Sequence, residues 1–450
     1  MDRKYDVITL GEILLRLSTP INGRLAQGDT FMKHLGGAEL NIASEIGQLG
    51  LNTAIISKIP TNLLAAFIKN QLNASRVSEN YLIEDHSDDS RIGIYYYEYG
   101  SYPRKPRVVY DRKHSSINNI EISDVPQTLF YNTRLFHTSG ITLGLGGKAQ
   151  DFAIHCIKEF KKQGTLISFD VNYRSNLWTG EEARKCIETI LPYVDIFFCS
   201  EDTARLTFGK TGTINEIQKS FCEEYPISVV ASTERTVITP KKHNFTSIIY
   251  SAKNDTYYRE NPYNNIDVVD RIGSGDAYVS GALYGYLKHG DCQKALEYGN
   301  AMAAIKHSVI GDMVFTDLEE IDSIIKHLIG APPLRASQVH WPQSLLTHDP
   351  AHHLLRDDER VRLVETQHAV DGPVAPYAPA ILEQARDAGP QHGVPVARGD
   401  RAALVIVGAA FQPHGIQTGR QAEFTPDRVD DPRPLPVRQH GRAEARVVGF

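Results

Sequence analysis

The hydrophobic positions of residues 5–330 fall into two alternating kinds of segment. Short apolar runs predict buried strands, and apolar residues spaced three and four positions apart predict helices. The predicted strands are residues 7–10, 53–57, 135–137, 166–170, 196–198, 228–231, 236–239 and 247–250. The predicted helices are residues 42–49, 149–163, 181–191, 201–208, 277–289, 292–307 and 317–328. Because strands and helices alternate, the pattern predicts an α/β fold with a parallel sheet.

Residues 91–110 depart from this alternation. Residues 91–99 are rich in tyrosine and alternate in the manner of a strand, and residues 107–110 form a second strand-like run. The pattern predicts a small β-sheet beside the main domain, with its strands within residues 12–35 and 88–115. Its tyrosines have two interpretations. They form a packing face or dimer contact, or the sheet is a lid whose tyrosines and arginines meet a polar, anionic substrate.

A glycine turn precedes the predicted helix 277–289. Gly273, Ser274 and Gly275 follow a strand-like run, and Asp276 lies in the first helical turn. The first amides of a helix lack internal acceptors, and the helix dipole places partial positive charge there. The turn can therefore bind a phosphate while Asp276 accepts a proton from an attacking hydroxyl. The alternative is a simple helix start at which Asp276 only favours the dipole.

Composition narrows the classes of partner. The 450 residues carry a formal net charge of -6, and no long basic run is present, which argues against nucleic acid as the main partner. No apolar stretch approaches the roughly 20 residues of a membrane span. The N-terminus leads directly into a strand, so no signal peptide is expected. The five cysteines lack metal-ligand spacing, as expected for reduced thiols in a cytoplasmic protein.

Residues 331–450 have a different composition. No lysine follows Lys326, whereas 14 of the 23 prolines lie in this tail, together with many Arg, His, Gln and Ala residues. Such a segment buries too little apolar surface to offset its ordering entropy. Its histidines show no repeated ligand spacing, so a metal site is not expected. We therefore predict one domain over residues 1–330 and a tail of non-native origin, either a fusion or a read-through in another frame.

Two motifs together carry a family resemblance. The run Gly36-Gly37-Ala38-Glu39-Leu40-Asn41 and the run from Asp270 to Ala277 resemble the two signatures of the ribokinase-like (PfkB) carbohydrate kinases. The resemblance implies a doubly wound sheet flanked by helices, with a small β-sheet lid. It implies that Asp276 is the general base and that the amides of Gly273, Ser274 and Gly275 bind the transferring phosphoryl group. ATP with Mg²⁺ is the implied donor, with a monovalent cation such as K⁺ near Asp270.

Within the family, the residues resemble the 2-keto-3-deoxygluconate kinases. The resemblance implies substrate contacts from both motifs, the lid and later loops: Gly36, Gly37, Glu39, Asn41, Tyr95, Tyr110, Arg112, Arg174 and Asp312. Arginine with tyrosine hydroxyls suits the carboxylate of a sugar acid, which a neutral sugar lacks. Each arginine also has an alternative role that does not involve the substrate. For Arg174 the alternative is a salt bridge with Asp170, and for Arg112 it is a solvated position on the surface.

The resemblance is weaker on the nucleotide side. It implies nucleotide contacts from Ser200, Asn300, Gly273 and Gly275. The family's Asn-x-x-Glu motif aligns with residues 200–203, where Thr203 replaces the glutamate, so Mg²⁺ organisation either passes to Glu201 or Asp202 or is weaker. Arg271 stands where a small residue or proline is common, and residues 232–236 replace a glycine-bearing turn.

The expected function is ATP-dependent phosphorylation of 2-keto-3-deoxygluconate to its 6-phosphate in the cytoplasm. Two other functions stay open: a fructokinase or ribokinase type of neutral-sugar kinase, and a catalytically weak regulator that binds sugar or nucleotide. A homodimer through the lid is also expected from its tyrosine-rich and β-branched strands.

Overall fold

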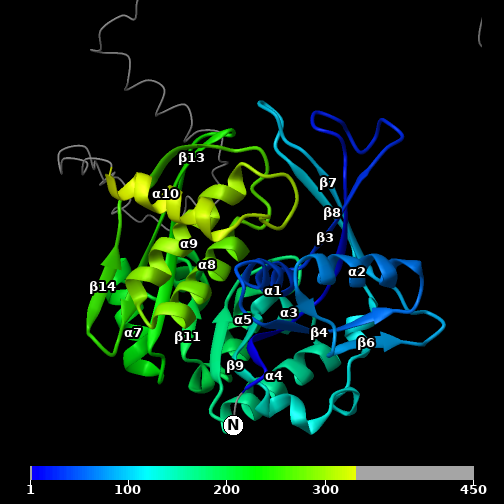
Figure 1. Cartoon of the computed structure of the whole chain (residues 1–450), viewed down its shortest axis with the longest axis horizontal. Coiled ribbons are helices and arrows are strands. Elements are labelled where there is room, and N and C mark those ends of the chain that lie inside the picture. Colours follow the sequence, from blue (N-terminus) through cyan, green and yellow to red (C-terminus); the bar gives the residue numbers. More distant parts are fainter. Residues whose placement is uncertain (1–2, 331–450) are drawn as a thin grey trace, which may run out of the picture. The chain divides into compact units, whose positions relative to one another are not determined.

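The computed structural model describes residues 3–330, and a sheet of 11 strands lies at the centre of this part (Figure 1). The predicted tail lies outside the described residues. Along the main path, neighbouring strands are β14 (Thr256–Arg259), β13 (Lys242–Ser251), β12 (Val229–Thr239), β11 (Ile196–Phe198), β10 (Leu166–Asp170), β9 (Thr133–Ser139), β1 (Tyr5–Leu10), β4 (Thr53–Pro60) and β5 (Val77–Ser78). Two further strands pair off this path: β15 (Tyr263–Asp267) with β13, and β6 (Leu82–Asp85) with β4.

The strand order reverses at β1, which confirms the doubly wound arrangement. β1 pairs in parallel with both β4 and β9, so that Val7 lies between Thr53 and Leu135. From there the chain builds outward in one direction through β4 and in the other through β9, β10, β11 and β12. In open α/β sheets, ligands bind beyond the carboxyl ends of the strands at such a reversal.

Helices cover both faces of the sheet. One face packs on α4 (Gly147–Lys162), α5 (Gly180–Glu188), α6 (Glu201–Phe208) and α7 (Ile214–Glu224), and the other on α1 (Ala38–Gln48), α8 (Ser274–His289) and α9 (Cys292–His307). A hydrophobic core lies on each face of the sheet, and successive residues of a strand point into opposite cores. Ile8 and Phe136 belong to the core under α4–α7, and Val7 and Leu135 to the core under α1, α8 and α9. The remaining helices are α2 (Leu63–Ala74), α3 (Gly140–Gly144), α10 (Leu318–Gly330) and 3-10 turns at Ser116–Asn119, Ile122–Asp124, Gln127–Tyr131 and Leu191–Tyr193. No helix within residues 3–330 is long and apolar enough to cross a membrane.

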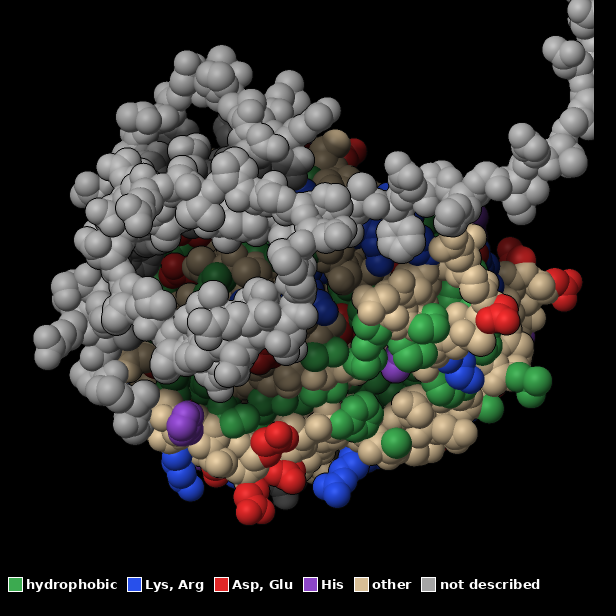
Figure 2. Space-filling view, turned by 90° about the horizontal axis from the view of Figure 1, so that it is seen from above, with side chains coloured by type: hydrophobic (Ala, Val, Ile, Leu, Met, Phe, Trp, Pro, Cys, Tyr) green, Lys and Arg blue, Asp and Glu red, His purple; other side chains and the backbone are tan. Residues whose placement is uncertain are grey.

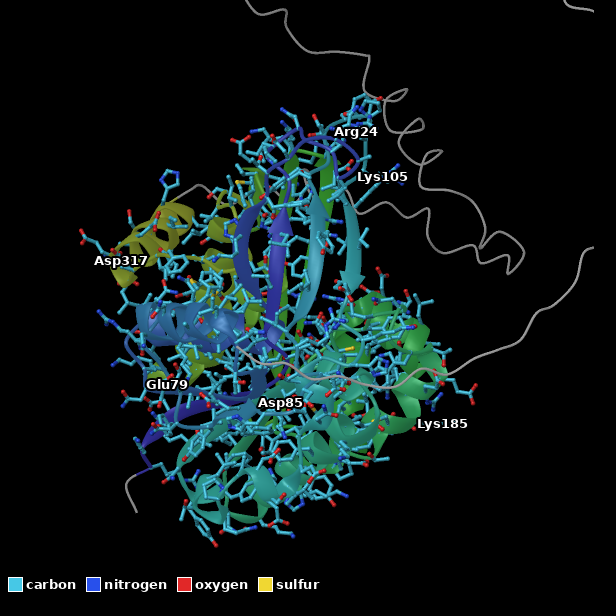
Figure 3. All side chains as sticks on the ribbon, turned by 90° about the vertical axis from the view of Figure 1, so that its right-hand side faces the viewer. Arg24, Glu79, Asp85, Lys105, Lys185 and Asp317 are labelled. Carbon is cyan, nitrogen blue, oxygen red and sulfur yellow. The ribbon has the colours of Figure 1, made fainter. Side chains whose placement is uncertain are left out.

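A second sheet of four strands forms the predicted lid. Its order is β3 (Met32–Gly36), β2 (Leu14–Ser18), β7 (Gly93–Glu98) and β8 (Arg107–Asp111). Figure 3 shows these strands side by side, with Arg24 and Lys105 at their upper end. We call this sheet the lid. Leu14, Tyr95, Tyr97 and Tyr99 form its buried cluster, against which Ile272 of the glycine turn packs.

Residues 228–239 correct one prediction. Instead of two strands separated by residues 232–235, β12 is continuous, and Ser232 to Thr236 pair one by one with residues of β13. The segment that replaces the glycine-bearing turn is therefore a strand of a hairpin. The predicted helix 181–191 is also shorter: α5 ends at Glu188, and a 3-10 turn that contains Pro192 follows. Proline in a helix interior removes a hydrogen bond and clashes with the preceding turn.

Candidate active site

The glycine turn opens α8 toward free space. Gly273 is the N-cap residue with φ 85°, and a Cβ placed there would lie 1.8 Å from the carbonyl oxygen of Asp312. Only glycine fits this position. Gly275 is exposed, and a Cβ placed on it would meet no atom within 4 Å. The Ser274 amide donates to Arg271 O within the turn, at 3.2 Å. The amides of Gly275 and Asp276 lie in the first helical turn, where no intrahelical acceptor exists, so this end of α8 can bind an anion.

The Asp276 carboxylate is held by two asparagines from other elements. Asn41 Nδ2, in the first turn of α1, donates to Asp276 Oδ2 at 2.7 Å. Asn172 Nδ2, just after β10, lies 3.5 Å from Asp276 Oδ1. Burial raises the pKa of Asp276 to about 6, against the lowering effects of Asn41 and Arg174. Burial and the charge of Asp276 also raise the pKa of Asp170, at the end of β10, to about 7. Asp276 is therefore placed and tuned as a base that is ionised above about pH 6.

The bond from Asn41 gives a test of this assignment. Because Asn41 stabilises the ionised carboxylate, Asn41→Ala is expected to raise the pKa of Asp276 further. The acid limb of the kcat/KM profile should then move to higher pH, with most activity restored at alkaline pH. Asn73→Ala, on the exposed side of α2, is the matched control and should leave the limb in place. An unchanged limb in Asn41→Ala would contradict the role of Asp276 as the titrating base.

A buried arginine, which the sequence reading did not identify, links the lid to the turn. Arg16 of β2 is 0 % exposed and forms ion pairs with Asp270, at 2.5 Å, and with Asp312, at 2.7 Å. Its guanidinium also lies 4.4 Å from the centroid of the Tyr97 ring. Burial acts to lower the pKa of Arg16, but Asp312, Tyr95 and Asp270 raise it above its ordinary value. Arg16 thus holds three segments together: the lid, the start of the glycine turn, and the loop before α10.

Asp270 and Asp312, which were predicted to contact a cation and the substrate, both accept hydrogen bonds within the protein. The Asp270 carboxylate accepts bonds from Arg16, from the Gly311 amide at 3.2 Å and from the Ile272 amide at 3.0 Å. Both oxygens of this carboxylate therefore already accept hydrogen bonds, which disfavours the predicted monovalent cation. Asp312 accepts bonds from Arg16 and from the Tyr95 hydroxyl, and both Asp312 and Tyr95 are buried. Asp312 and Tyr95 thus bind each other, and their contacts with a substrate stay predictions.

The first glycine motif is mainly structural. Glu39 is 1 % exposed, and its Oε1 accepts bonds from the Ser139 amide, the Ser139 hydroxyl and the Thr142 hydroxyl. The prediction that Glu39 contacts the substrate directly is therefore wrong: it joins α1 to the end of β9. Gly37 has φ 124°, and a Cβ there would lie 2.2 Å from Glu12 O. A Cβ on Gly36 would lie 2.3 Å from Asp312 Oδ2. Both glycines permit close packing beside the turn.

The two predicted arginines differ in their surroundings. Arg112 forms a buried ion pair with Glu12, so the alternative of a solvated surface residue is wrong. Arg174 is exposed and donates to its neighbour's carbonyl, Tyr173 O, at 3.0 Å. The alternative salt bridge between Arg174 and Asp170 is absent among the described ion pairs. Arg174 lies close enough to Asp276 to lower that group's pKa. Tyr110 of the lid is 42 % exposed, with its ring centroid 5.8 Å from that of Tyr95.

Gly273 and Gly275 adjoin Asp276, whereas the other residues predicted for the nucleotide side lie on α6 and α9 or at their ends. Ser200 caps α6, where its Oγ accepts a bond from the Thr203 amide at 3.2 Å. Glu201 Oε1 accepts from Arg205. Asn300 of α9 is fully buried and donates to Glu260 at 2.6 Å, so it does not itself face a ligand. Glu260 lines a surface pocket of about 480 Å³ with Arg259, Asn261 and Leu328, and burial raises its pKa to about 8. No cluster of three metal-ligating side chains occurs within residues 3–330.

Comparison with known proteins identifies the family. The sequence model of the pfkB family of carbohydrate kinases matches residues 4–317, most of the described part. The chain belongs to this family. It is therefore a carbohydrate kinase, as the two glycine motifs predicted. The structure has the ribokinase-like fold of these kinases, with a mixed central sheet and a smaller separate sheet.

Relatives of this pfkB kinase include enzymes for deoxy-sugar acids. It is 29% identical over 321 residues to the 2-dehydro-3-deoxygalactonokinase of Haloferax volcanii, covering 71% of this chain and 96% of the relative. It is 26% identical to the 2-dehydro-3-deoxygluconokinase of Bacillus subtilis, covering 69% and 92%. Among solved structures, the 2-dehydro-3-deoxygluconokinase of Thermotoga maritima superposes with a TM-score of 0.68 at 32% identity, covering 72% of this chain and 100% of that chain.

Proposed function

We propose that this kinase transfers the γ-phosphoryl group of ATP to the 6-hydroxyl of 2-keto-3-deoxygluconate, also named 2-dehydro-3-deoxygluconate. The choice of a sugar acid over a neutral sugar rests on the surroundings of Arg174. Its guanidinium is exposed, lies within electrostatic range of Asp276 and Asp170, and forms no ion pair with a carboxylate among residues 3–330. A guanidinium in this position suits a substrate carboxylate. The names of the relatives agree with this choice.

The described residues supply positioning and charge in this reaction. Asp276 accepts the proton of the sugar hydroxyl as it attacks, and Asn41 and Asn172 hold the carboxylate in place. The open N-terminus of α8 stabilises the negative charge of the phosphoryl group in transfer. Phosphoryl transfer needs little covalent help from the protein, so positioning and charge stabilisation suffice.

Magnesium, which accompanies ATP in such reactions, neutralises phosphate charge. It needs only one or two protein carboxylates beside the phosphates and water. Glu201 fits this role: its Oε1 accepts from Arg205, while no partner of Oε2 occurs within the described part. The neighbouring Glu234 is close enough for Glu201 to raise its pKa, after the larger effect of burial. We assign Mg²⁺ to Glu201 on this basis.

Substitution of Arg174 tests the choice of substrate. Arg174→Ala removes a charge-assisted contact, so KM for 2-keto-3-deoxygluconate is expected to rise by about tenfold or more, with a much smaller effect on any turnover of fructose or ribose. Steady-state kinetics with the three sugars measure this. The control is Arg184→Ala, which removes an exposed arginine on α5 and should not change the KM of any of the three sugars.

Other results of these kinetic measurements would contradict the proposed substrate or indicate a different function. Equal effects of Arg174→Ala on acid and neutral sugars would remove the argument for a carboxylate. Turnover of fructose or ribose alone would identify a neutral-sugar kinase. Nucleotide binding without turnover of any sugar would identify a regulator.

We also propose a homodimer through the lid. Figure 2 shows apolar side chains exposed between charged ones on one face of the molecule. On the edge strand β8, Val108, Val109 and Tyr110 are 40–52 % exposed. An apolar edge strand favours pairing with another chain. Light scattering should give twice the chain mass, and Val109→Lys should reduce it to the monomer.

A further inference from the structure

Lys306 is a buried cation without a carboxylate partner. It lies in the last turn of α9, and it is 0 % exposed. Its Nζ donates to two main-chain carbonyls, Asp270 O at 3.0 Å and Val309 O at 2.9 Å. No ion pair of Lys306 occurs within residues 3–330. A buried ammonium is costly unless its surroundings compensate it, so the converging carbonyls require an explanation.

These carbonyls belong to the two segments that support the anion-binding turn. The amides of Val269 and Asp270 donate to His307 O at 2.8 and 3.2 Å, so the start of the turn rests on the C-terminal end of α9. That end of a helix carries partial negative charge, which a cation stabilises. Val309 precedes Gly311, whose amide binds the Asp270 carboxylate. Lys306 therefore lies between the C-terminal end of α9 and the turn that starts α8.

The same contacts leave no place for a monovalent metal cation at Asp270. Hard cations take several oxygen ligands. The carboxylate of Asp270 is bound to Arg16 and two amides, and its carbonyl oxygen accepts from Lys306. The residues present thus do not fit K⁺, although the sequence motif implies it. An ammonium group occupies the position where the main-chain oxygens converge.

Among the four buried charged side chains Arg16, Lys306, Asp270 and Asp312, the charges balance only when Lys306 is counted. Arg16 and Lys306 contribute two positive charges, and Asp270 and Asp312 contribute two negative charges, which sum to zero. Burial raises the pKa of Glu45, which also faces Lys306, to about 8, so it is mainly neutral at pH 7. Burial lowers the pKa of Lys306, and the charges of Asp270 and Asp312 oppose this. Without Lys306, a net negative charge would lie beside the turn that must bind a phosphate.

We propose that the Lys306 ammonium is a built-in monovalent cation: a positioning residue that keeps the Asp270–Gly275 turn able to bind phosphate, and that makes this kinase independent of K⁺. The inference rests on the proposed phosphoryl transfer. It goes further by assigning a task to a side chain that does not touch the substrate, and by predicting the ion requirement of the enzyme.

The first test uses the unaltered protein. Initial rates with 2-keto-3-deoxygluconate and MgATP are compared in KCl and in choline chloride at the same ionic strength of about 0.15 M, so that screening is equal. The rates are expected to agree within about twofold, because the site already holds a cation. Activation by K⁺ of about tenfold or more over choline would overturn the proposal.

The second test removes the Lys306 side chain, so that an added cation can take the place of its ammonium group. Lys306→Ala is expected to lower kcat by about 10- to 100-fold with a smaller change in the KM of the sugar, since charge support of the turn is lost. KCl or methylammonium chloride, but not choline chloride, should restore at least part of kcat. Lys294→Ala, which removes a half-buried lysine of the same helix whose side chain is 43 % exposed, is the control and should respond to none of the salts. Loss of kcat in folded Lys306→Ala without rescue by either cation would overturn the proposal.

Thermal unfolding separates this inference from the proposed function. The Tm of Lys306→Ala should rise in KCl or methylammonium relative to choline, whereas the Tm of the wild type should not differ between these salts. If Lys306→Ala does not fold, Lys306→Met replaces it, because methionine keeps most of the length of the side chain without its charge. The Tm and kcat of Lys306→Met should be lower than those of the wild type. Neither should respond to cations, since the methionine fills the site. If the wild type turns over no sugar acid, the proposed function fails, while a cation-dependent Tm of Lys306→Ala still supports the built-in cation and its absence contradicts it.

Discussion

Asp276→Asn is expected to lower kcat by about 10²- to 10⁴-fold, the usual contribution of a general base. Asparagine keeps the size of the side chain and can still accept a bond from Asn41, but it cannot take the proton of the sugar hydroxyl. The same substitution should raise Tm at pH 8. Burial raises the pKa of Asp276 to about 6, above the value near 4 of an unfolded chain. The folded state therefore disfavours the ionised form, and stability from this group is lost as pH rises through about 6.

The pH profile of the wild type checks the same residue independently. Because the base must be ionised, kcat/KM should fall about tenfold per pH unit below about pH 6. Asp89→Asn, on an exposed loop, makes the same chemical change away from the site and should alter neither kcat nor Tm. Residual activity in Asp276→Asn within about tenfold of the wild type would exclude the assignment of the general base.

The parts of the fold that the sequence predicted well have both a periodic core face and local end signals. The helix predicted at 292–307 coincides with α9, because Asp291 caps its start and Gly290, with φ 67°, ends the preceding helix. α2 was not predicted, although Ala65, Ile68 and Leu72 form its buried face at helical spacing. The continuity of β12 was not predictable in this way. Its second half is exposed, so hairpin pairing with β13, and not an apolar run, makes it a strand.

The sequence predicted those parts of the candidate site whose functional residues are neighbours in the chain. Asp276 and the glycines of its turn lie together in the sequence, and their conformations follow from local rules. The role of Glu39 was not predictable, because its three donors come from residues about 100 positions away. Arg16 gave one signal, a lone charge within the apolar run 13–17, but its partners are 254 and 296 positions away. Only the tertiary fold could assign them.

Arg16→Met is expected to lower the free energy of unfolding by about 3–5 kcal/mol, the largest effect on stability among these substitutions. Arg16 is fully buried, and its removal leaves the carboxylates of Asp270 and Asp312 without their cation in the protein interior. Methionine fills much of the volume, so the loss reports the charges more than a cavity. Urea unfolding at constant pH, with the slope m compared between variants, measures the change.

Combining substitutions separates the cost of unpaired charges from the value of the ion pairs. The triple variant Arg16→Met, Asp270→Asn, Asp312→Asn removes the uncompensated carboxylates and should regain part of the lost stability, since neutral replacement of a buried ionic group costs less than breaking it. Arg184→Met, in an exposed pair with Glu188 on α5, should cost less than about 1 kcal/mol. A loss that small in Arg16→Met would mean that Arg16 does not join the lid to the glycine turn. If instead the triple variant is no more stable than Arg16→Met, the cost lies in lost packing and hydrogen bonds around Tyr97, and not in unpaired charge.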